Sequence, residues 1–173
     1  MDFELQPTIE NDLVKIQPLK PTDFELLYKI ASDPLIWEQH PNKDRYQREV
    51  FQTFFKGAIE SGGAFLVFNN KGEPIGSSRF YEFDKNASSI LIGYTFIAKD
   101  HWGREYNKAL KSVMLKHAFK FVDTVFFHIG STNIRSQKAI EKLGAKKMGE
   151  VEVAYYGEAT KLNFIYQIEK DNW

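Results

Sequence analysis

The middle of the chain contains three strand-like segments separated only by tight turns, and this arrangement constrains the fold most strongly. The segments are Ala64–Phe68, Ile75–Phe83 and Ser89–Ile97. Asn69-Asn70-Lys71-Gly72 and Asp84-Lys85-Asn86, which separate them, are typical turn sequences. Connections this short join antiparallel neighbours, because parallel strands need a crossover of a dozen or more residues. We therefore predict an antiparallel meander of three strands.

Further helices and strands are expected on both sides of this meander. Apolar residues recur every three or four positions in four stretches, which predicts helices over about 22–33, 44–61, 104–121 and 133–143. Alternating or short apolar runs predict strands at about 14–17, 124–129, 147–156 and 160–168. The resulting order, β-α-α-β-β-β-α-β-α-β-β, predicts one α+β domain over residues 1–173.

Composition agrees with one globular domain and excludes several classes of site. The chain has 173 residues, of which 43% are hydrophobic, so it can bury a substantial core. It has no cysteine, which excludes disulfides, iron–sulfur clusters and a thiol nucleophile, and its four histidines lack metal-ligand spacing. The start of the sequence is acidic, and no apolar stretch is long enough for a transmembrane helix. We therefore expect a cytoplasmic protein without a metal site.

The charge of the chain sums to zero, with 23 basic and 23 acidic residues, but it is unevenly distributed. Residues 99–150 carry 11 basic and 5 acidic side chains, whereas residues 1–98 carry 10 and 14. Zero net charge argues against a dedicated nucleic-acid-binding protein, which gains affinity from many phosphate contacts. The basic segment indicates either a small polyanion bound locally or the solvated faces of two helices.

Two stretches in or beside this basic segment are arranged like binding sites. In Leu91–Leu110, a strand leads through a short loop to the start of a helix, whose free amides and dipole favour phosphate groups. That helix carries Lys108, Lys111, Lys116 and Lys120. In the second stretch, Asn133 and Ser136 fall at the start of another helix, where both residue types are also ordinary caps.

Together these stretches resemble the GCN5-related N-acetyltransferase (GNAT) superfamily, in particular the branch that acetylates the N-termini of ribosomal proteins. The resemblance covers about residues 9–169. Its most specific part is N-x-x-S-x-x-x-x-x-K-L-G, from Asn133 to Gly144, preceded by Ile92-Gly93-Tyr94 and by W-G-x-x-Y from Trp102. The resemblance implies a mixed, mostly antiparallel sheet with helices on both faces, in which the fourth and fifth strands splay apart.

The resemblance also implies acetyl-coenzyme A as a cosubstrate. Its pantetheine arm would pair with the backbone of the fourth strand at Phe96, Ile97 and Ala98. Its pyrophosphate would bind the amides of one loop, composed of Trp102, Gly103, Arg104, Glu105, Tyr106 and Asn107. Asn133 would hold the pantetheine arm, and Ser136 would lie near the sulfur and protonate the leaving thiolate. The alternative for Ser136 is that it only satisfies a helix amide.

Several positions depart from the family pattern. Glu105 and Asn107 stand where the loop usually has small residues, and an inward-pointing Glu105 would repel the pyrophosphate. A frequent tyrosine acid is replaced by Ile140, and a frequent acidic residue before Ile92 is replaced by Leu91. Another glutamate of the family would fall near Tyr155, with Glu152 three residues earlier. The remaining candidate bases, acting through water, are Glu38, Glu82, Asp84 and Glu152, and Tyr155 is a further candidate catalytic group.

The implied reaction is direct attack of a primary amine on the thioester, which needs no protein nucleophile. The acceptor would bind at the two early helices and their connection, including Trp37, Glu38 and His40, together with Tyr94. The acidic balance of residues 1–98 suits a cationic amine, such as a peptide N-terminus or a polyamine. The first alternative is a non-catalytic acyl-coenzyme A-binding protein on the same fold. A nucleic-acid-binding or protein-interaction domain is a less favoured alternative. Neither a nucleic acid nor a membrane is expected as a partner.

Overall fold

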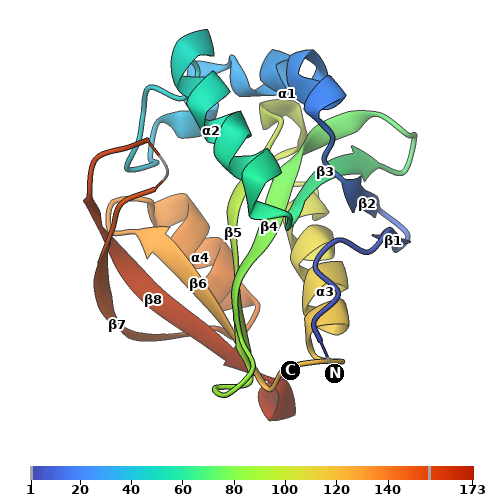
Figure 1. Ribbon diagram of the computed structural model, residues 1–173, viewed down its shortest axis with the longest axis vertical. Coiled ribbons are helices and arrows are strands. Elements are labelled where there is room, and N and C mark those ends of the chain that lie inside the picture. The colour runs from blue at the N-terminus through green and yellow to red at the C-terminus, as the bar shows by residue number, and fades with distance from the viewer. Residues whose placement is uncertain (1, 156) are drawn as a thin grey trace.

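In the computed structural model, which describes residues 2–155 and 157–173, eight strands form one sheet (Figure 1). The strands follow the order β1-β2-β3-β4-β5-β6-β8-β7 across this sheet. Their bounds are β1 Ile9–Glu10, β2 Val14–Pro18, β3 Ala64–Asn69, β4 Pro74–Asp84, β5 Ser89–Ile97, β6 Thr124–Gly130, β7 Lys146–Val153 and β8 Lys161–Glu169. Neighbouring strands are antiparallel except for β5 and β6, which run parallel.

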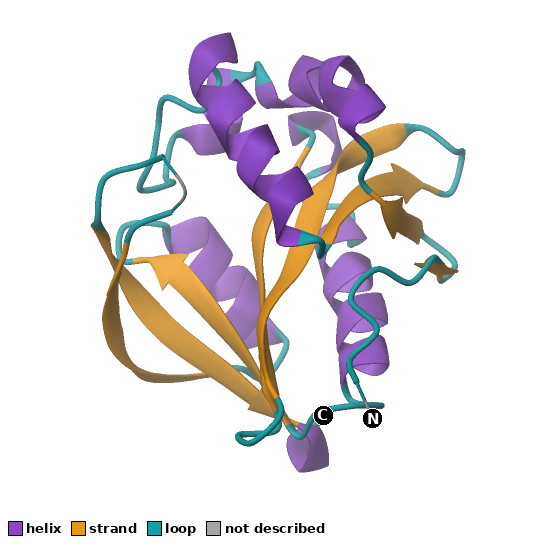
Figure 2. Cartoon of the chain, in the orientation of Figure 1, coloured by secondary structure: helices purple, strands orange, loops and turns teal. Residues whose placement is uncertain are grey.

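Helices cover both faces of the sheet (Figure 2). They are α1 Phe24–Ala31, α2 Arg48–Ser61, α3 Tyr106–Ala118 and α4 Ile134–Lys142, with short 3-10 turns at Pro21–Asp23, Pro34–Trp37, Lys99–His101 and Lys170–Asn172. One hydrophobic core joins α3 to the sheet through residues such as Phe80 and Ile92, and a second joins α1 and α2 to it through Leu66 and Phe96. No helix in the described part of the chain has the length and apolarity needed to cross a membrane.

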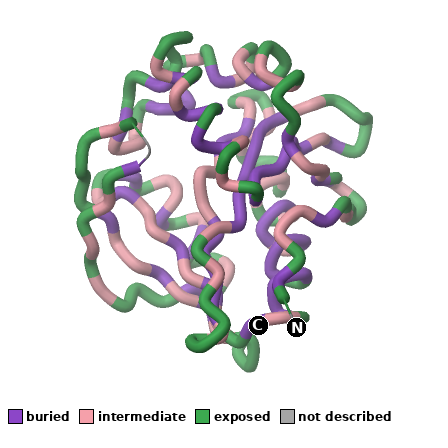
Figure 3. The backbone as a smooth tube through the Cα atoms, viewed as in Figure 1, coloured by how far each residue is buried: buried purple, intermediate pink, exposed green. Residues whose placement is uncertain are grey.

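The sheet divides between β5 and β6, as the resemblance implied. These strands pair only where Ser89–Leu91 lies beside Thr124–Phe126, and beyond that point they diverge (Figure 1). Among the described residues, the edge of β5 from Ile92 to Ile97 therefore has no partner strand. The buried stretches of β4 and β5 run along this fork (Figure 3). The fork thus leaves backbone groups of a central strand available to a ligand.

The predicted α+β order and the antiparallel meander are confirmed. A two-residue strand, β1, precedes the first predicted strand, so the fourth and fifth predicted strands are β5 and β6. Two helices begin later than predicted, α2 at Arg48 and α3 at Tyr106. Glu105 has a left-handed backbone that cannot continue a helix, and residues 44–47 form a turn that directs Arg45 inward. The predicted strand over 147–156 ends at Val153, and its last position, Tyr156, lies outside the described residues.

Candidate active site

The loop between β5 and α3 leaves backbone amides free at the start of a helix. Glu105 is the N-cap of α3, and its carbonyl accepts a hydrogen bond from the amide of Ala109. Among the described residues, nothing accepts a hydrogen bond from the amides of Tyr106, Asn107 and Lys108. These amides lie in the first turn of α3, at the positive end of the helix dipole. An anionic group bound there would accept their hydrogen bonds and would be stabilised by the dipole.

The Glu105 carboxylate lies in solvent and makes no cap hydrogen bond with these amides. Its side chain is 70% exposed and lies 3.8 Å from the Nζ of Lys108. The predicted repulsion of a pyrophosphate is therefore weak, because water and Lys108 screen the charge. Lys111, by contrast, is not available to a phosphate as the sequence suggested. It is buried, and its Nζ donates to Thr95 Oγ1 at 2.5 Å.

Asn133 and Ser136 have different roles at the start of α4. The Asn133 side-chain oxygen accepts a hydrogen bond from the amide of Ser136 at 3.2 Å, so Asn133 is the helix cap. Its amide nitrogen Nδ2 and the Ser136 hydroxyl make no hydrogen bond with a described residue. The proposal that Ser136 only satisfies a helix amide is therefore wrong, because Asn133 does so.

The open end of the fork is lined by an indole and a guanidinium. Trp102 donates from Nε1 to the carbonyl of Ile97 at 2.9 Å, and the Arg135 guanidinium stacks 3.9 Å above the indole. Arg135 is held from the other side, since its amide donates to Gln39 Oε1. Phe96 and Ile97 are buried and Ala98 is half-buried. The predicted pantetheine-binding segment of β5 therefore lies under the Trp102–Arg135 stack.

A bulge in β5 turns Tyr94 onto the face of the sheet that α1 and α2 cover. Tyr94 has a φ of 54°, and the pairing with β4 shifts between Ser77 and Arg79. The Tyr94 ring lies 4.9 Å from that of Tyr155 and 5.1 Å from that of Tyr81. Burial raises the pKa of Tyr94 and raises that of Tyr155 to about 12, so both phenols are neutral at pH 7. The Tyr155 hydroxyl already donates to Asn163 Oδ1 at 3.0 Å.

Beside these tyrosines lies a buried ion pair that the sequence did not reveal. Arg45 is 1% exposed, and its guanidinium donates to both carboxylate oxygens of Glu158, at 2.6 and 3.0 Å. The pair joins the connection before α2 to the loop between β7 and β8. His40 lies 3.2 Å from Arg45, and burial together with the Arg45 charge holds the pKa of His40 well below its ordinary value. His40 is therefore uncharged at neutral pH.

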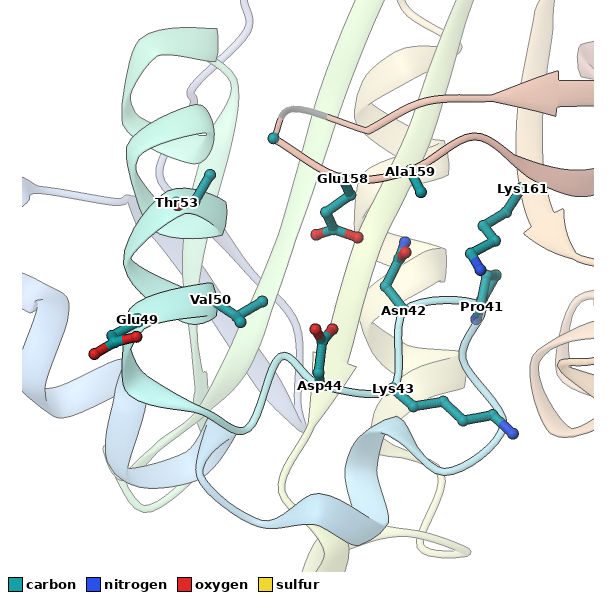
Figure 4. A pocket seen from close by; sticks show the side chains of 11 residues that line it. Pro41, Asn42, Lys43, Asp44, Glu49, Val50, Thr53, Glu158, Ala159 and Lys161 are labelled. Atoms are coloured by element: carbon teal, nitrogen blue, oxygen red, sulfur yellow. The ribbon is translucent and has the colours of Figure 1, made fainter.

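A cavity of about 660 Å³ lies outside this ion pair, between the connection, α2 and the β7–β8 loop (Figure 4). Asn42 and Glu158 point into it from two sides, and Val50 and Thr53 line it from α2.

Two of the predicted acceptor-binding residues, Trp37 and Glu38, differ in how far they are buried. Trp37 is buried against Phe96, and its indole donates to the carbonyl of Ala31, whereas Glu38 is exposed.

A second cavity, of about 630 Å³, lies where β5 and β6 begin to diverge. It brings together two of the candidate bases, Glu82 and Asp84, with His128. Burial lowers the pKa of His128, and the Glu82 charge opposes that effect, so His128 is a neutral imidazole at pH 7. Of the other candidates, Glu152 is exposed on the edge strand β7. In the sequence, His128 falls within the apolar run 124–129 and has no metal-ligand spacing, so its place in this cavity could not be predicted.

The described residues contain no group of three or more histidine, aspartate or glutamate side chains that could hold a metal ion. The site is therefore built from free backbone amides, an unpaired strand edge, neutral aromatic groups and buried arginines.

The chain was compared with known families and structures. The acetyltransferase (GNAT) domain family matches residues 14–146. No curated protein matches the chain. A protein of T. thermophilus, provisionally classed as an acetyltransferase, is similar at 22% identity and a TM-score of 0.81, over 99% of this chain and 94% of that one. A GCN5-related N-acetyltransferase from Brucella melitensis is similar at 16% identity and a TM-score of 0.79, over 97% of this chain and 80% of that one. Mycobacterium smegmatis RimJ in complex with CoA-disulfide is similar at 17% identity and a TM-score of 0.70, over 91% of this chain and 82% of that one.

Proposed function

Because the chain belongs to the GNAT acetyltransferase family, we propose that it transfers an acetyl group from acetyl-coenzyme A to a primary amine. The observation that carries the proposal is the fork between β5 and β6, whose unpaired edge leads to the free amides at the start of α3. Amides at a helix N-terminus bind phosphate groups, and an unpaired strand edge binds an extended amide-containing chain. Both requirements of coenzyme A are met along one continuous path.

Different groups of the chain would bind different parts of acetyl-coenzyme A. The amides of Tyr106 and Asn107 would hold the pyrophosphate, and the edge of β5 at Phe96 would hold the pantetheine arm, with Asn133 Nδ2 as a further donor. When bound, acetyl-coenzyme A supplies an activated acyl group. Trp102 and Arg135 lie at the mouth of this path, so they would cover the pantetheine arm once it is seated.

The acceptor amine must lose a proton, and the cavity of about 630 Å³ where β5 and β6 begin to diverge offers groups for that step. His128 lies two residues beyond Phe126, the last residue of β6 that pairs with β5. As a neutral imidazole beside Glu82, it can accept a proton at neutral pH. Ser136 donates to the leaving thiolate in this proposal. Tyr94 and Tyr155, as neutral phenols, form the wall of the acceptor site.

The test has two parts, because binding and turnover separate this function from a non-catalytic coenzyme A-binding protein. Calorimetry with acetyl-coenzyme A is expected to show binding, and mixing the protein with acetyl-coenzyme A and a panel of amines is expected to release free thiol. Binding without thiol release from any amine would support the non-catalytic alternative. Absence of binding at millimolar ligand would contradict both.

Glu105→Gly is expected to stabilise the fold without changing the affinity for acetyl-coenzyme A. Glu105 has a φ of 70°, which costs about 1 kcal/mol for a residue with a Cβ. Relief of this cost should raise the melting temperature by ~2–4 °C. Because the carboxylate points to solvent, the Kd should change by less than about threefold, since screening weakens its interaction with a bound anion.

Gly103→Ala is the matched control for this effect. Gly103 has a φ of 72° and no atom within 4 Å of an added Cβ, so only backbone strain opposes an alanine there. The control should lower the melting temperature. A tenfold tighter Kd for Glu105→Gly would contradict the outward orientation of the carboxylate.

Ser136→Ala is expected to lower kcat by about 10- to 100-fold, because a weak acid near the sulfur assists a leaving group that is already a fair one. Its melting temperature should stay unchanged, since the Ser136 amide keeps its hydrogen bond to Asn133. Asn133→Ala is the control for the cap and should cost about 1 kcal/mol of stability. An unchanged kcat for Ser136→Ala would remove the acid from the proposal.

The narrower proposal, a ribosomal-protein N-terminal acetyltransferase, rests on the spacing of Asn133, Ser136 and Gly144. RimJ of M. smegmatis is 17% identical, so its similarity supports the fold alone. A peptide with a free N-terminal serine, included in the amine panel, tests this branch directly.

A further inference from the structure

Arg79, on β4, is a buried guanidinium that lacks an anionic partner. It is 5% exposed, and its Nε is fully buried. Within residues 2–155 and 157–173, none of its guanidinium nitrogens makes a hydrogen bond or an ion pair. Burial lowers the pKa of Arg79 to about 10, which still leaves it charged at neutral pH. A buried charge without a partner is costly, so proteins rarely keep one where no ligand supplies the opposite charge.

The surroundings of Arg79 leave its donors free for a ligand. The guanidinium stacks 3.7 Å from the centre of the Tyr94 ring. Stacking occupies a face of the guanidinium, whereas its N–H groups point outward in the plane and can bind a carboxylate at two points. Burial raises the pKa of Tyr81 well above its ordinary value, and that of Tyr94 also rises, so neither phenol neutralises Arg79.

The buried carboxylate of Glu158 lies near this cluster, but it already binds another arginine, Arg45. Arg45 and Arg79 lie 4.6 and 5.7 Å from the same ring, that of Phe54. Glu158 binds Arg45 through both oxygens, and His40 is neutral. The buried cluster therefore holds one positive charge in excess.

A second buried donor without a partner lies on the same side of the sheet. Within the described chain, two buried side-chain nitrogens lack a hydrogen-bond partner, Arg79 Nε and Asn42 Nδ2. Asn42 lines the cavity outside the Arg45–Glu158 pair (Figure 4). Both atoms are donors with almost no accessible surface, so the partner that each lacks is an acceptor oxygen, and Arg79 can reach a ligand only through its terminal guanidinium nitrogens.

We propose that the acceptor is an amine that carries a carboxylate one carbon away, as an α-amino acid does, and that Arg79 binds this carboxylate. The inference rests on the proposed acetyl transfer. Tyr94 is two residues from Phe96 on β5, so a carboxylate held in the plane above its ring lies beside the strand edge that would bind the pantetheine arm. An amine one carbon from that carboxylate can then face the thioester.

This inference departs from the cationic acceptor that the acidic balance of residues 1–98 suggested. The exposed carboxylates of that segment, such as Glu38, lie at the surface, whereas the buried acceptor face has an excess of positive charge. A polyamine would bring like charges together there.

The experiment compares matched amines that differ only in the carboxylate. The pairs are L-phenylalanine with phenethylamine, L-leucine with isoamylamine, and L-lysine with cadaverine, each with acetyl-coenzyme A. The carboxylate-bearing member is expected to have a kcat/KM about 10- to 100-fold higher, as for a charged hydrogen-bonded pair. Arg79→Met should abolish this ratio. Arg48→Met should keep it, because Arg48 also stacks on a tyrosine but is exposed and paired with Glu25.

Binding is measured separately from turnover, so that failure of the carboxylate site can be told apart from failure of the proposed acetyl transfer. N-acetyl-L-phenylalanine should raise the melting temperature of the wild type and of Arg48→Met but not of Arg79→Met, whereas N-acetylphenethylamine should raise none. If Arg79→Met does not fold, the wild-type comparison of the matched pairs and of the two acetylated products decides. Equal or better turnover of the carboxylate-free amines, or turnover of the serine peptide alone, would overturn the inference and leave acetyl transfer standing. Arg79-dependent binding without turnover of any amine would leave Arg79 as a carboxylate-binding group, but it would contradict the transferase and with it the assignment of the acceptor.

Discussion

Glu158→Gln should destabilise the protein by about 3–5 kcal/mol, because the change leaves a buried Arg45 charge without its counter-ion. Arg45 is 1% exposed, and the Glu158 side chain is 8% exposed, so water solvates the guanidinium poorly once the carboxylate charge is gone. The guanidinium also lies against three aromatic rings, those of Phe54, Tyr155 and Trp37. Rings stabilise a cation less than a carboxylate does, so they offset only a small part of the loss. Thermal unfolding should show a melting temperature ~6–20 °C lower.

Glu25→Gln is the matched control for this prediction. The Arg48–Glu25 pair is also joined by two hydrogen bonds, but its side chains are 48% and 71% exposed. Exposed pairs contribute little, so the melting temperature should hardly move. Joint replacement of Arg45 by Met and Glu158 by Leu should recover most of the stability lost in Glu158→Gln, because no buried charge then remains. A double variant as unstable as the single one would mean that packing, rather than charge, holds the β7–β8 loop.

The sequence was informative where local patterns determine structure. Turn residues and short connections predicted the β3-β4-β5 meander, and the spacing of Asn133 and Ser136 predicted the start of α4. These features depend on neighbours in the chain, and backbone propensities express them directly. The fork itself followed from a family resemblance. No local pattern shows that β5 and β6 pair over only three residues.

The charged part of the acceptor face could not be predicted in this way. Arg45 and Glu158 are 113 positions apart, and each looks like an ordinary surface residue in sequence. Arg79 stands within the apolar and small residues of 75–80, which are all buried, and this was the one available signal, because a charged side chain is rarely buried without a partner. Lys111 was expected to be accessible, either to a phosphate or to water, because lysine is seldom buried, but the structure buries it.

Lys111→Met should stabilise the protein and remove a pH dependence from its unfolding. Lys111 is buried, and desolvation lowers its pKa from 10.5 to about 7 in the folded state. Between these two values the unfolded chain binds a proton at Lys111 that the folded chain does not. The free energy of unfolding therefore rises with pH in this window, by up to about 1.4 kcal/mol per pH unit, and falls as the pH is lowered from 10.5 toward 7.

At pH 7 most of this cost is present, so the methionine variant should gain about 2 kcal/mol or more, which corresponds to ~4–8 °C in melting temperature. Thr95 keeps a partner in the variant, because its hydroxyl also lies 2.8 Å from Ser78 Oγ. Lys108→Met, on the exposed side of the same helix, is the control and should change neither the stability nor its slope with pH. If wild type and Lys111→Met show parallel stability curves between pH 7 and 10, Lys111 is protonated in the fold. Its charge would then have to be solvated inside the α3–β5 interface, which contradicts the neutral amine inferred from its burial.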